Sequence, residues 1–146
     1  PALRDQILRT GCLSNLIAIY VLPRTTVASF ADVGVISLLC EIICYLSLDE
    51  HQRVRLCVHG VIPTLLRALY EYPSHPCVVE PAVEALSLLA LDDDIASAMR
   101  SIKVLQEISG LETEDVTTQT RLQGLHQRLR PTESTEEGNQ EGDAPA

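Results

Sequence analysis

Apolar residues recur along this chain at the spacing of helices, in blocks separated by glycine, proline and aspartate. In "RLCVHGVIPTLLRAL", residues 55–69, a glycine and a proline stand three residues apart between two leucine-rich blocks. The pattern predicts a short helix over 49–59, with Asp49 as its N-terminal cap. Gly60 ends this helix, because glycine adopts a positive φ without the steric cost of a Cβ atom. A second helix follows, with Pro63 in its first turn, where a missing N–H costs no hydrogen bond.

The next blocks predict which faces are buried. The second helix is closed by the loop "YPSHP", and a third helix is expected from about Glu80 to Leu91, with Pro81 tolerated near its start. A further helix near 120–130 carries Gln and Arg and is expected to form a polar C-terminal cap. The residues expected to face the core are Leu65, Leu66 and Leu69 in the second helix, and Ala82, Ala85, Leu86, Leu89 and Ala90 in the third.

Two of these blocks recur along the chain. The segment "ILRTGCLSNLIAIYVL" (7–22) aligns with "LCVHGVIPTLLRALYE" (56–71), 49 residues later. The segment "LCEIICYLSLDE" (39–50) aligns with "AVEALSLLALDD" (82–93), 43 residues later. Offsets of about 40 to 47 residues are typical of armadillo-type and HEAT-type helical repeats. The longer first offset indicates an insertion of six residues around 23–34. A weaker third copy follows in 101–108, where Val104, Leu105 and Ile108 fall on Val61, Ile62 and Leu65.

Two motifs resemble the armadillo family. "GVIPTLL" resembles the G-A-I-P-x-L-V turn of armadillo repeats, and "AVEALSLLA" resembles their third-helix signature A-L-x-A-L-x-N-L-A. The resemblance covers roughly residues 4–130. It implies an all-α fold, a right-handed α-solenoid of two to three stacked repeats over residues 1–130. HEAT-like packing and a generic α-helical bundle stay open as alternatives.

The resemblance also implies a binding surface. In armadillo repeats a Trp and an Asn of the third-helix signature line a concave groove, and the Asn holds the main chain of an extended peptide. The Trp position falls here on Glu41 and Glu84, and the Asn position on Tyr45 and Leu88. Leu88 cannot form a side-chain hydrogen bond, so the patch favours a protein or peptide partner with apolar side chains flanked by Lys or Arg, such as an amphipathic helix. The alternative is that neighbouring repeats cover Tyr45 and Leu88.

Composition and charge refine this picture. The chain is 46% hydrophobic but 3% aromatic, so its core must be built from Leu, Ile, Val and Ala. A net charge of −9 argues against nucleic acid, which requires clustered Lys and Arg. Five acidic residues and no basic ones lie in the tail "PTESTEEGNQEGDAPA" (131–146). We expect this tail to be disordered, because it cannot bury enough apolar surface to offset its ordering entropy.

The cysteines and the apolar runs indicate the cellular compartment in which we expect the protein. Five cysteines, an odd number set in apolar runs, are typical of reduced, buried thiols in a cytoplasmic or nuclear protein. The longest apolar stretch, 35–48, is interrupted by Glu41 and is too short to span a bilayer. We therefore expect no membrane association.

Candidate chemistry is sparse. Cys57 and His59, with His75 and Cys77, form a C-x-H…H-x-C arrangement whose spacing is not that of a usual zinc site. The "LDDD" run (91–94) is typical of a solvated turn and helix cap. There is no G-x-S-x-G motif and no glycine-rich phosphate loop. We expect no catalytic residue, metal or cofactor.

Two functions fit these observations. The first is a non-catalytic protein–protein interaction or scaffold module. The second is a C-terminal helical-repeat appendage that regulates or stabilises an enzyme, for example a kinase-like protein, whose catalytic domain is absent from this chain. Because the chain begins at Pro1 rather than Met, we expect missing repeats or domains of the same protein.

Overall fold

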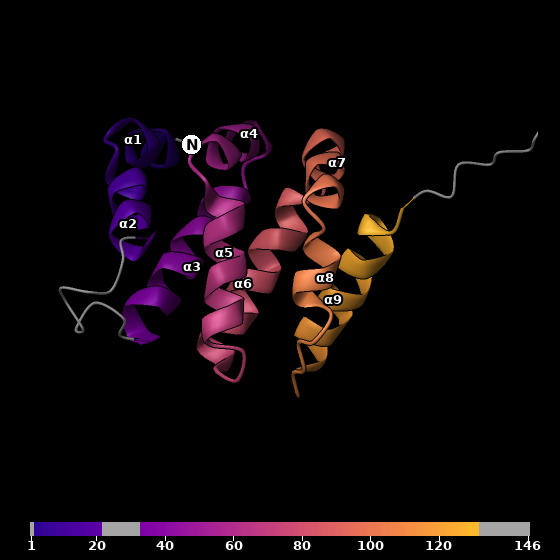
Figure 1. Cartoon of the computed structure of the whole chain (residues 1–146). Coiled ribbons are helices and arrows are strands. Elements are labelled where there is room, and N and C mark those ends of the chain that lie inside the picture. Colours follow the sequence, from indigo (N-terminus) through magenta and orange to yellow (C-terminus); the bar gives the residue numbers. More distant parts are fainter. Residues whose placement is uncertain (1, 22–32, 132–146) are drawn as a thin grey trace, which may run out of the picture.

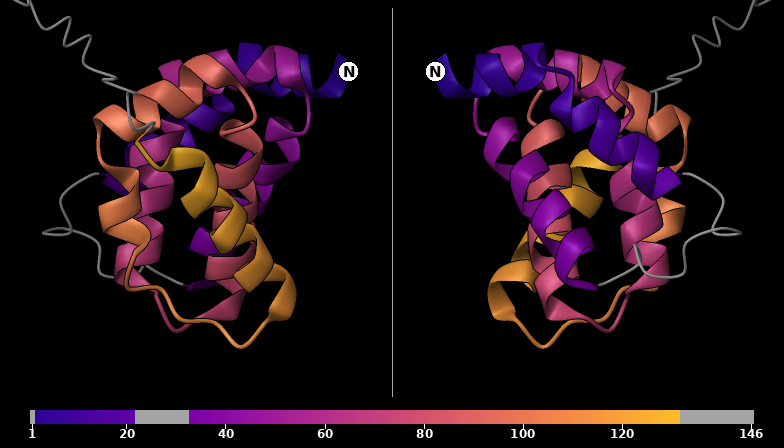
Figure 2. Two further views of the ribbon diagram at one scale, coloured as in Figure 1. Left: turned by 90° about the vertical axis from the view of Figure 1, so that its right-hand side faces the viewer. Right: turned by 90° about the vertical axis from the view of Figure 1, so that its left-hand side faces the viewer.

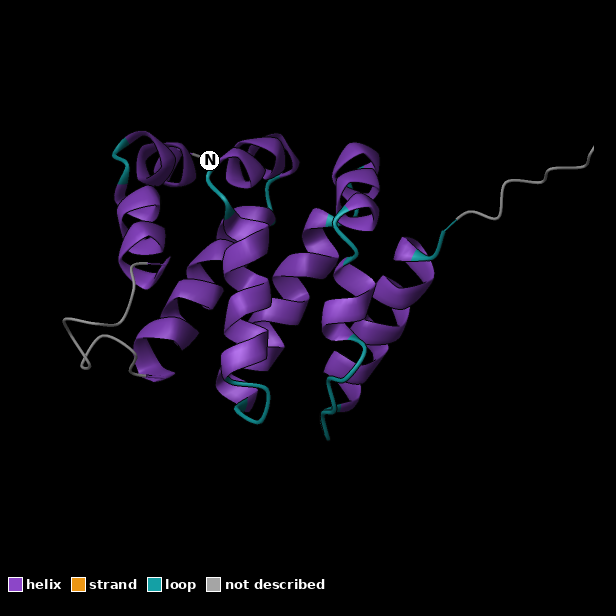
Figure 3. Ribbon diagram, viewed as in Figure 1, coloured by secondary structure: helices purple, strands orange, loops and turns teal. Residues whose placement is uncertain are grey.

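The computed structural model of this protein describes residues 2–21 and 33–131. Within these ranges the fold is all-helical and contains no strand (Figure 3). The helices are α1 (Ala2–Arg9), α2 (Cys12–Val21), α3 (Val33–Ser47), α4 (Glu50–Val58), α5 (Val61–Glu71), α6 (Pro76–Leu89), α7 (Asp93–Ser101), α8 (Val104–Ile108) and α9 (Val116–Leu129).

The helices form two packed rows. In one row α6 lies between α3 and α9, and in the other α5 lies between α2 and α8. The rows are joined by contacts of α5 with α6 and of α8 with α9. The short helices α1, α4 and α7 lie along one edge of both rows (Figure 1). The views along the row direction show the two rows as separate layers (Figure 2).

The joint between α4 and α5 has the predicted geometry. Asp49 caps α4, and its carboxylate accepts a hydrogen bond from the His51 amide at 3.0 Å. Gly60 separates the two helices with a φ of 79°. Pro63 lies in the first turn of α5. The sequence prediction for this segment is therefore confirmed, including the reason for the glycine.

Two other residues share the backbone conformation of Gly60. Gly11 has a φ of 69° immediately before α2, and Lys103 has a φ of 59° immediately before α8. Lys103 is the one non-glycine residue with positive φ in the described part of the chain. All three residues turn the chain from a short edge helix into a helix of the α2–α5–α8 row.

The third predicted helix begins earlier than expected. α6 begins at Pro76 rather than near Glu80, because proline is favoured in the first helical turn and His75 is extended before it. Pro81 therefore lies inside the helix and cannot donate to the Cys77 carbonyl. The Ser37 hydroxyl of α3 donates to that carbonyl at 2.7 Å. A neighbouring helix thus replaces the hydrogen bond that the proline removes.

The core is built from small and branched apolar side chains. Within the described residues the buried apolar side chains are those of Leu, Ile, Val, Ala and Cys with Met99, and none is aromatic. This confirms the expectation from composition, with cysteine and methionine added. Leu66 is only half-buried, whereas the other predicted core residues of α5 and α6 are buried: Leu65, Leu69, Ala82, Ala85, Leu86, Leu89 and Ala90.

Other predictions are only partly covered by the described residues. The tail expected over 131–146 and the insertion expected around 23–34 lie almost entirely outside them. None of the described helices has the length and apolar character required to cross a bilayer.

Candidate functional site

The start of α9 supplies a fixed negative charge beside α6. Asp115 caps α9, and one of its carboxylate oxygens accepts hydrogen bonds from the Thr118 hydroxyl and the Thr118 amide, both at 2.7 Å. These hydrogen bonds lower the pKa of Asp115 from its ordinary value, because they stabilise the charged form. Asp115 is therefore a carboxylate at neutral pH.

A small hollow of about 390 Å³ lies where α3, α6 and the start of α9 meet. Its carboxylates come from three elements, and its only basic lining residue among those described is Arg121. The Arg121 Nη2 atom lies 3.1 Å from Glu84 Oε1, and both side chains are about one-third exposed. The carboxylates that line it are those of Glu41, Glu80, Glu84 and Asp115.

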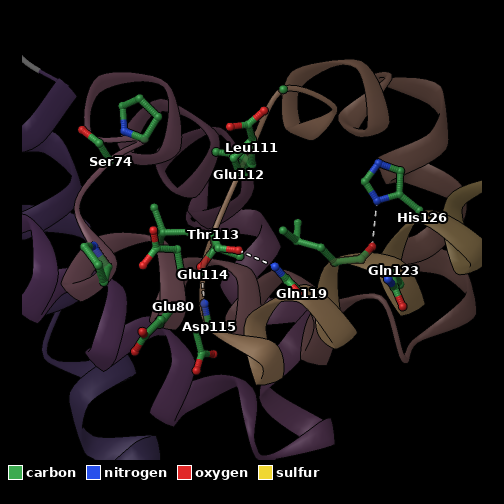
Figure 4. Close-up of a pocket in the computed structure, with 15 residues that line it drawn as sticks. Ser74, Glu80, Leu111, Glu112, Thr113, Glu114, Asp115, Gln119, Gln123 and His126 are labelled. Atoms are coloured by element: carbon green, nitrogen blue, oxygen red, sulfur yellow. Dashed lines mark hydrogen bonds between the residues drawn. The ribbon is translucent and has the colours of Figure 1, made fainter.

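A larger hollow of about 1150 Å³ adjoins the first (Figure 4). It lies between the loop that precedes α6, the segment 110–115 and one side of α9. Glu80 and Asp115 line both hollows, so the two hollows are neighbours that share part of their walls. Apolar lining comes from Val79, Leu111 and Leu122, and additional carboxylates come from Glu112 and Glu114. We refer to the two hollows together as the acidic hollow.

Internal hydrogen bonds fix one wall of the acidic hollow. The Gln119 side-chain amide donates to the Thr113 carbonyl at 2.6 Å, which ties the segment 110–115 to α9. His126 Nδ1 lies 2.7 Å from the Leu122 carbonyl one turn earlier on the same helix. The segment 110–115 is thus attached to α9 through the Gln119 side chain.

The structure brings together two of the four residues predicted from the armadillo signature. Glu41 and Glu84 both line the small hollow. Tyr45 lies apart from it, with the Arg4 guanidinium 4.6 Å from the centre of its ring. Leu88 is half-buried and packs against the core. The structure therefore divides the predicted partner-binding patch. Glu41 and Glu84 share the small hollow, whereas Tyr45 lies by Arg4 and Leu88 packs against the core.

The thiols near the acidic hollow are held in the protonated form. Burial raises the pKa of Cys44 to about 12, and the neighbouring Glu84 carboxylate adds to this shift. Burial likewise raises the pKa of Cys40 to about 12, with Cys44 as a secondary cause. Both thiols are buried and free, as the sequence predicts. The prediction of buried thiols is wrong for Cys12 and Cys77, which are exposed, and Cys57 is only half-buried. At neutral pH neither Cys40 nor Cys44 supplies a thiolate.

The C-x-H…H-x-C residues do not converge. Cys57 and His59 lie just before the start of α5, and His75 and Cys77 lie beyond its end. The 11 residues of α5 place the two pairs about 16 Å apart at 1.5 Å per residue. His59 Nδ1 instead contacts the Ser14 hydroxyl at 2.6 Å. In the described part of the chain no group of three or more His, Cys, Asp or Glu side chains could hold a metal ion.

Several residues of the acidic hollow were not identified from the sequence. Glu80, Asp115 and Arg121 lie in the lining but outside the predicted patch. The run "ETED" (112–115) was a usable signal, since three carboxylates follow a glycine just before a helix. Its position beside α6 depends on tertiary packing and has no counterpart in the aligned segments.

Comparison with known proteins adds no assignment. No family model, no curated protein and no solved structure matches this chain.

Proposed function

We propose that this chain is a non-catalytic protein–protein interaction module, built from armadillo-like helical repeats in a right-handed solenoid. On this proposal each repeat has a short edge helix, a second helix and a third helix, as in α4, α5 and α6. Each repeat buries its apolar faces against the next one. The acidic hollow receives a segment of a partner protein.

The spacing of the helix joints supports the repeat. The left-handed residues Gly11, Gly60 and Lys103 stand 49 and 43 residues apart, the two offsets at which the sequence resembles itself. The N-caps of α4 and α7, Asp49 and Asp92, are also 43 residues apart. Each of these aspartates accepts a hydrogen bond from the amide two residues later.

The lining of the acidic hollow carries the functional proposal. The lining contains one guanidinium, from Arg121, and six carboxylates, from Glu41, Glu80, Glu84, Glu112, Glu114 and Asp115. Such a surface attracts Lys or Arg side chains and disfavours acidic partners. Its apolar floor offers contact area to Leu-like or Val-like side chains. The partner is therefore an amphipathic segment in which apolar residues are flanked by basic ones.

A synthetic peptide tests this proposal. The probe is a fluorescein-labelled amphipathic helix of about 18 residues, with Leu on one face and Lys and Arg beside it. Fluorescence anisotropy measures its affinity for the wild-type chain and for the double variant Glu41→Lys/Glu84→Lys. We expect the double variant to bind about tenfold or more weakly, because attraction becomes repulsion. Binding should also weaken as salt is added.

A matched control separates local from overall charge. Glu50→Lys/Glu107→Lys changes the net charge equally at two exposed positions outside the hollow. It should reduce affinity by less than about threefold. Equal losses in the two double variants, or no loss in either, would reject the acidic hollow as the binding site. Thermal unfolding by circular dichroism verifies that both variants are folded.

A further inference from the structure

The face of α3 at the start of the helix row carries an exposed apolar stripe. Val35, Leu38 and Tyr45 are 46%, 56% and 43% exposed, and Ile42 between them is half-buried. Their spacing of three, four and three residues places them on one face of the helix. The right-hand view of Figure 2 looks onto this end of the molecule, where α2 and α3 face the viewer. An apolar stripe of this regularity indicates a contact surface.

Helix α6, which aligns with α3 at an offset of 43 residues, shows how the corresponding positions are packed. On α6 the residues 43 positions after the four stripe residues are Val78 and Ala85, which are fully buried, and Pro81 and Leu88, which are half-buried. α3 packs against α6, and its Ser37 hydroxyl contacts the carbonyl of the residue before Val78. Three small side chains of α3, those of Ser37, Cys40 and Cys44, lie near Cys77 or Glu84 of α6. The corresponding positions of α6 are thus shielded within the helix row, where α6 has a neighbour with small side chains.

A cation at one end of the stripe specifies the charge of the occupant. The Arg4 guanidinium lies over the Tyr45 ring at 4.6 Å. Its Nε atom is shielded from solvent and has no hydrogen-bond acceptor among the described residues. A shielded donor without an acceptor is uncommon in a folded protein, because it has lost water without replacing it. Because Nε is shielded, a partner carboxylate would pair with the guanidinium as a whole, whose positive charge favours an acidic occupant at this end of the stripe.

We propose that the stripe and Arg4 together bind an amphipathic helix of a partner protein, with small side chains along its contact face and a carboxylate at the Arg4 end. This surface shares α3 with the acidic hollow, because Glu41 lies on the same helix between Leu38 and Tyr45, but Arg4 and the four stripe residues do not line the hollow. One module would then bind two partner segments of different chemistry: a basic one at the acidic hollow and an acidic one on the α3 stripe.

Two labelled peptides test this assignment. Both are helices of about 18 residues with Ala and Ser at spacings of three and four, flanked by Leu. They differ by a single Glu or Gln at one end of the contact face. Anisotropy titrations measure both peptides against the wild type, Leu38→Asp and Arg4→Gln. Val58→Asp on α4 is the matched control, because Val58 is 82% exposed and outside the stripe.

The expected pattern is specific. The wild type should bind the Glu peptide about fivefold more tightly than the Gln peptide. Leu38→Asp should weaken both peptides about tenfold or more, whereas Val58→Asp should leave them unchanged. Arg4→Gln should abolish the preference for Glu and retain binding of the Gln peptide. No binding by the wild type, or equal effects of Leu38→Asp and Val58→Asp, would overturn the proposal.

The competing occupant is a second copy of this chain. Sedimentation velocity over a range of concentrations detects it as a dimer. A dimer that Leu38→Asp dissociates and Val58→Asp does not would assign the stripe to self-association and overturn the partner-helix proposal. A monomer at all concentrations, together with the peptide pattern above, supports it.

Discussion

The hydrogen bond between Ser37 and Cys77 is expected to compensate for Pro81. In a regular helix the amide of residue 81 donates to the carbonyl of residue 77, but proline has no N–H. The Ser37 hydroxyl, on a side chain that is 9% exposed, donates to that carbonyl at 2.7 Å. Removing this hydroxyl should therefore leave an acceptor of α6 without a protein partner.

The magnitude follows from the surroundings of the bond. A fully buried acceptor left unsatisfied costs about 1–3 kcal/mol of stability. Cys77 is itself exposed, so water can reach part of this site. We therefore expect Ser37→Ala to lower the free energy of unfolding by about 1 kcal/mol, at the low end of that range. Urea denaturation followed by far-UV circular dichroism measures this loss.

A double-mutant cycle isolates the cause. Pro81→Ala restores the backbone N–H, so the Cys77 carbonyl regains its donor within the helix. In this background Ser37→Ala should cost less than about 0.5 kcal/mol, which gives a coupling energy of about 0.5–1 kcal/mol. The control is Ser87→Ala in the same helix. The Ser87 hydroxyl donates at 2.9 Å to the Val83 carbonyl, which a helical N–H already satisfies.

Absence of coupling in this cycle would refute the compensating role of Ser37. If Ser37→Ala costs the same in the wild type and in the Pro81→Ala background, the hydroxyl does not replace the missing N–H, and its contribution is packing alone. A large loss for Ser87→Ala would also contradict the argument, because it would mean that any serine hydroxyl in α6 has this effect.

Three further predictions concern backbone conformation and titration. Gly60→Ala should lower the free energy of unfolding in urea by about 1–2 kcal/mol, because Gly60 has a positive φ. Gly124→Ala in α9 should raise it by up to about 1 kcal/mol, because alanine is the better helix former. Neither new Cβ atom would meet another atom within 4 Å, so the difference between the two sites is one of backbone conformation. Lys103→Gly should stabilise the folded chain by up to about 1 kcal/mol, because glycine adopts the left-handed conformation without strain. The greater flexibility of glycine in the unfolded state offsets part of this gain. An unchanged urea midpoint would contradict the prediction. The pKa values of Cys40 and Cys44 are raised from 9.0 to about 12 in the folded chain. Their contribution to stability is therefore complete below about pH 9 and is lost as the pH rises towards 12. Urea midpoints measured across this pH range should fall less when both residues are replaced by Ala.

Much of the fold was predictable because local chemistry determines it. The α4–α5 joint depends on Asp49, Gly60 and Pro63, and each acts through its own backbone or its nearest neighbours. The start of α6 was misjudged because Pro81 was interpreted as a helix start. Whether a proline begins a helix or lies within one depends on a partner for the freed carbonyl. That partner, Ser37, is 40 residues away in the sequence.

The left-handed joint before α8 was not predictable from its residue type. At position 60 the glycine itself indicates a positive φ. Position 103 is a lysine, a residue type that rarely adopts a positive φ, so its conformation is not indicated by its type. Its conformation is inferable only by aligning Val104 with Val61, which places Lys103 on Gly60. The alignment therefore carries structural information that single-residue preferences do not contain.

The acidic hollow lies where the chain departs most from that alignment. α5 has 11 residues, whereas α8 has five and ends at Ile108, just before Ser109 and Gly110. Glycine is a poor helix former, and the chain from Gly110 to Asp115 then runs without helix beside the start of α6. In the 43-residue alignment, positions 110–114 correspond to 67–71, which lie in the second half of α5. The shortened helix instead leaves Glu112, Glu114 and Asp115 in a non-helical segment that lines the same hollow as Glu80. The feature that carries the proposed binding chemistry thus arises from an irregularity, which is where functional sites are expected in an otherwise regular fold.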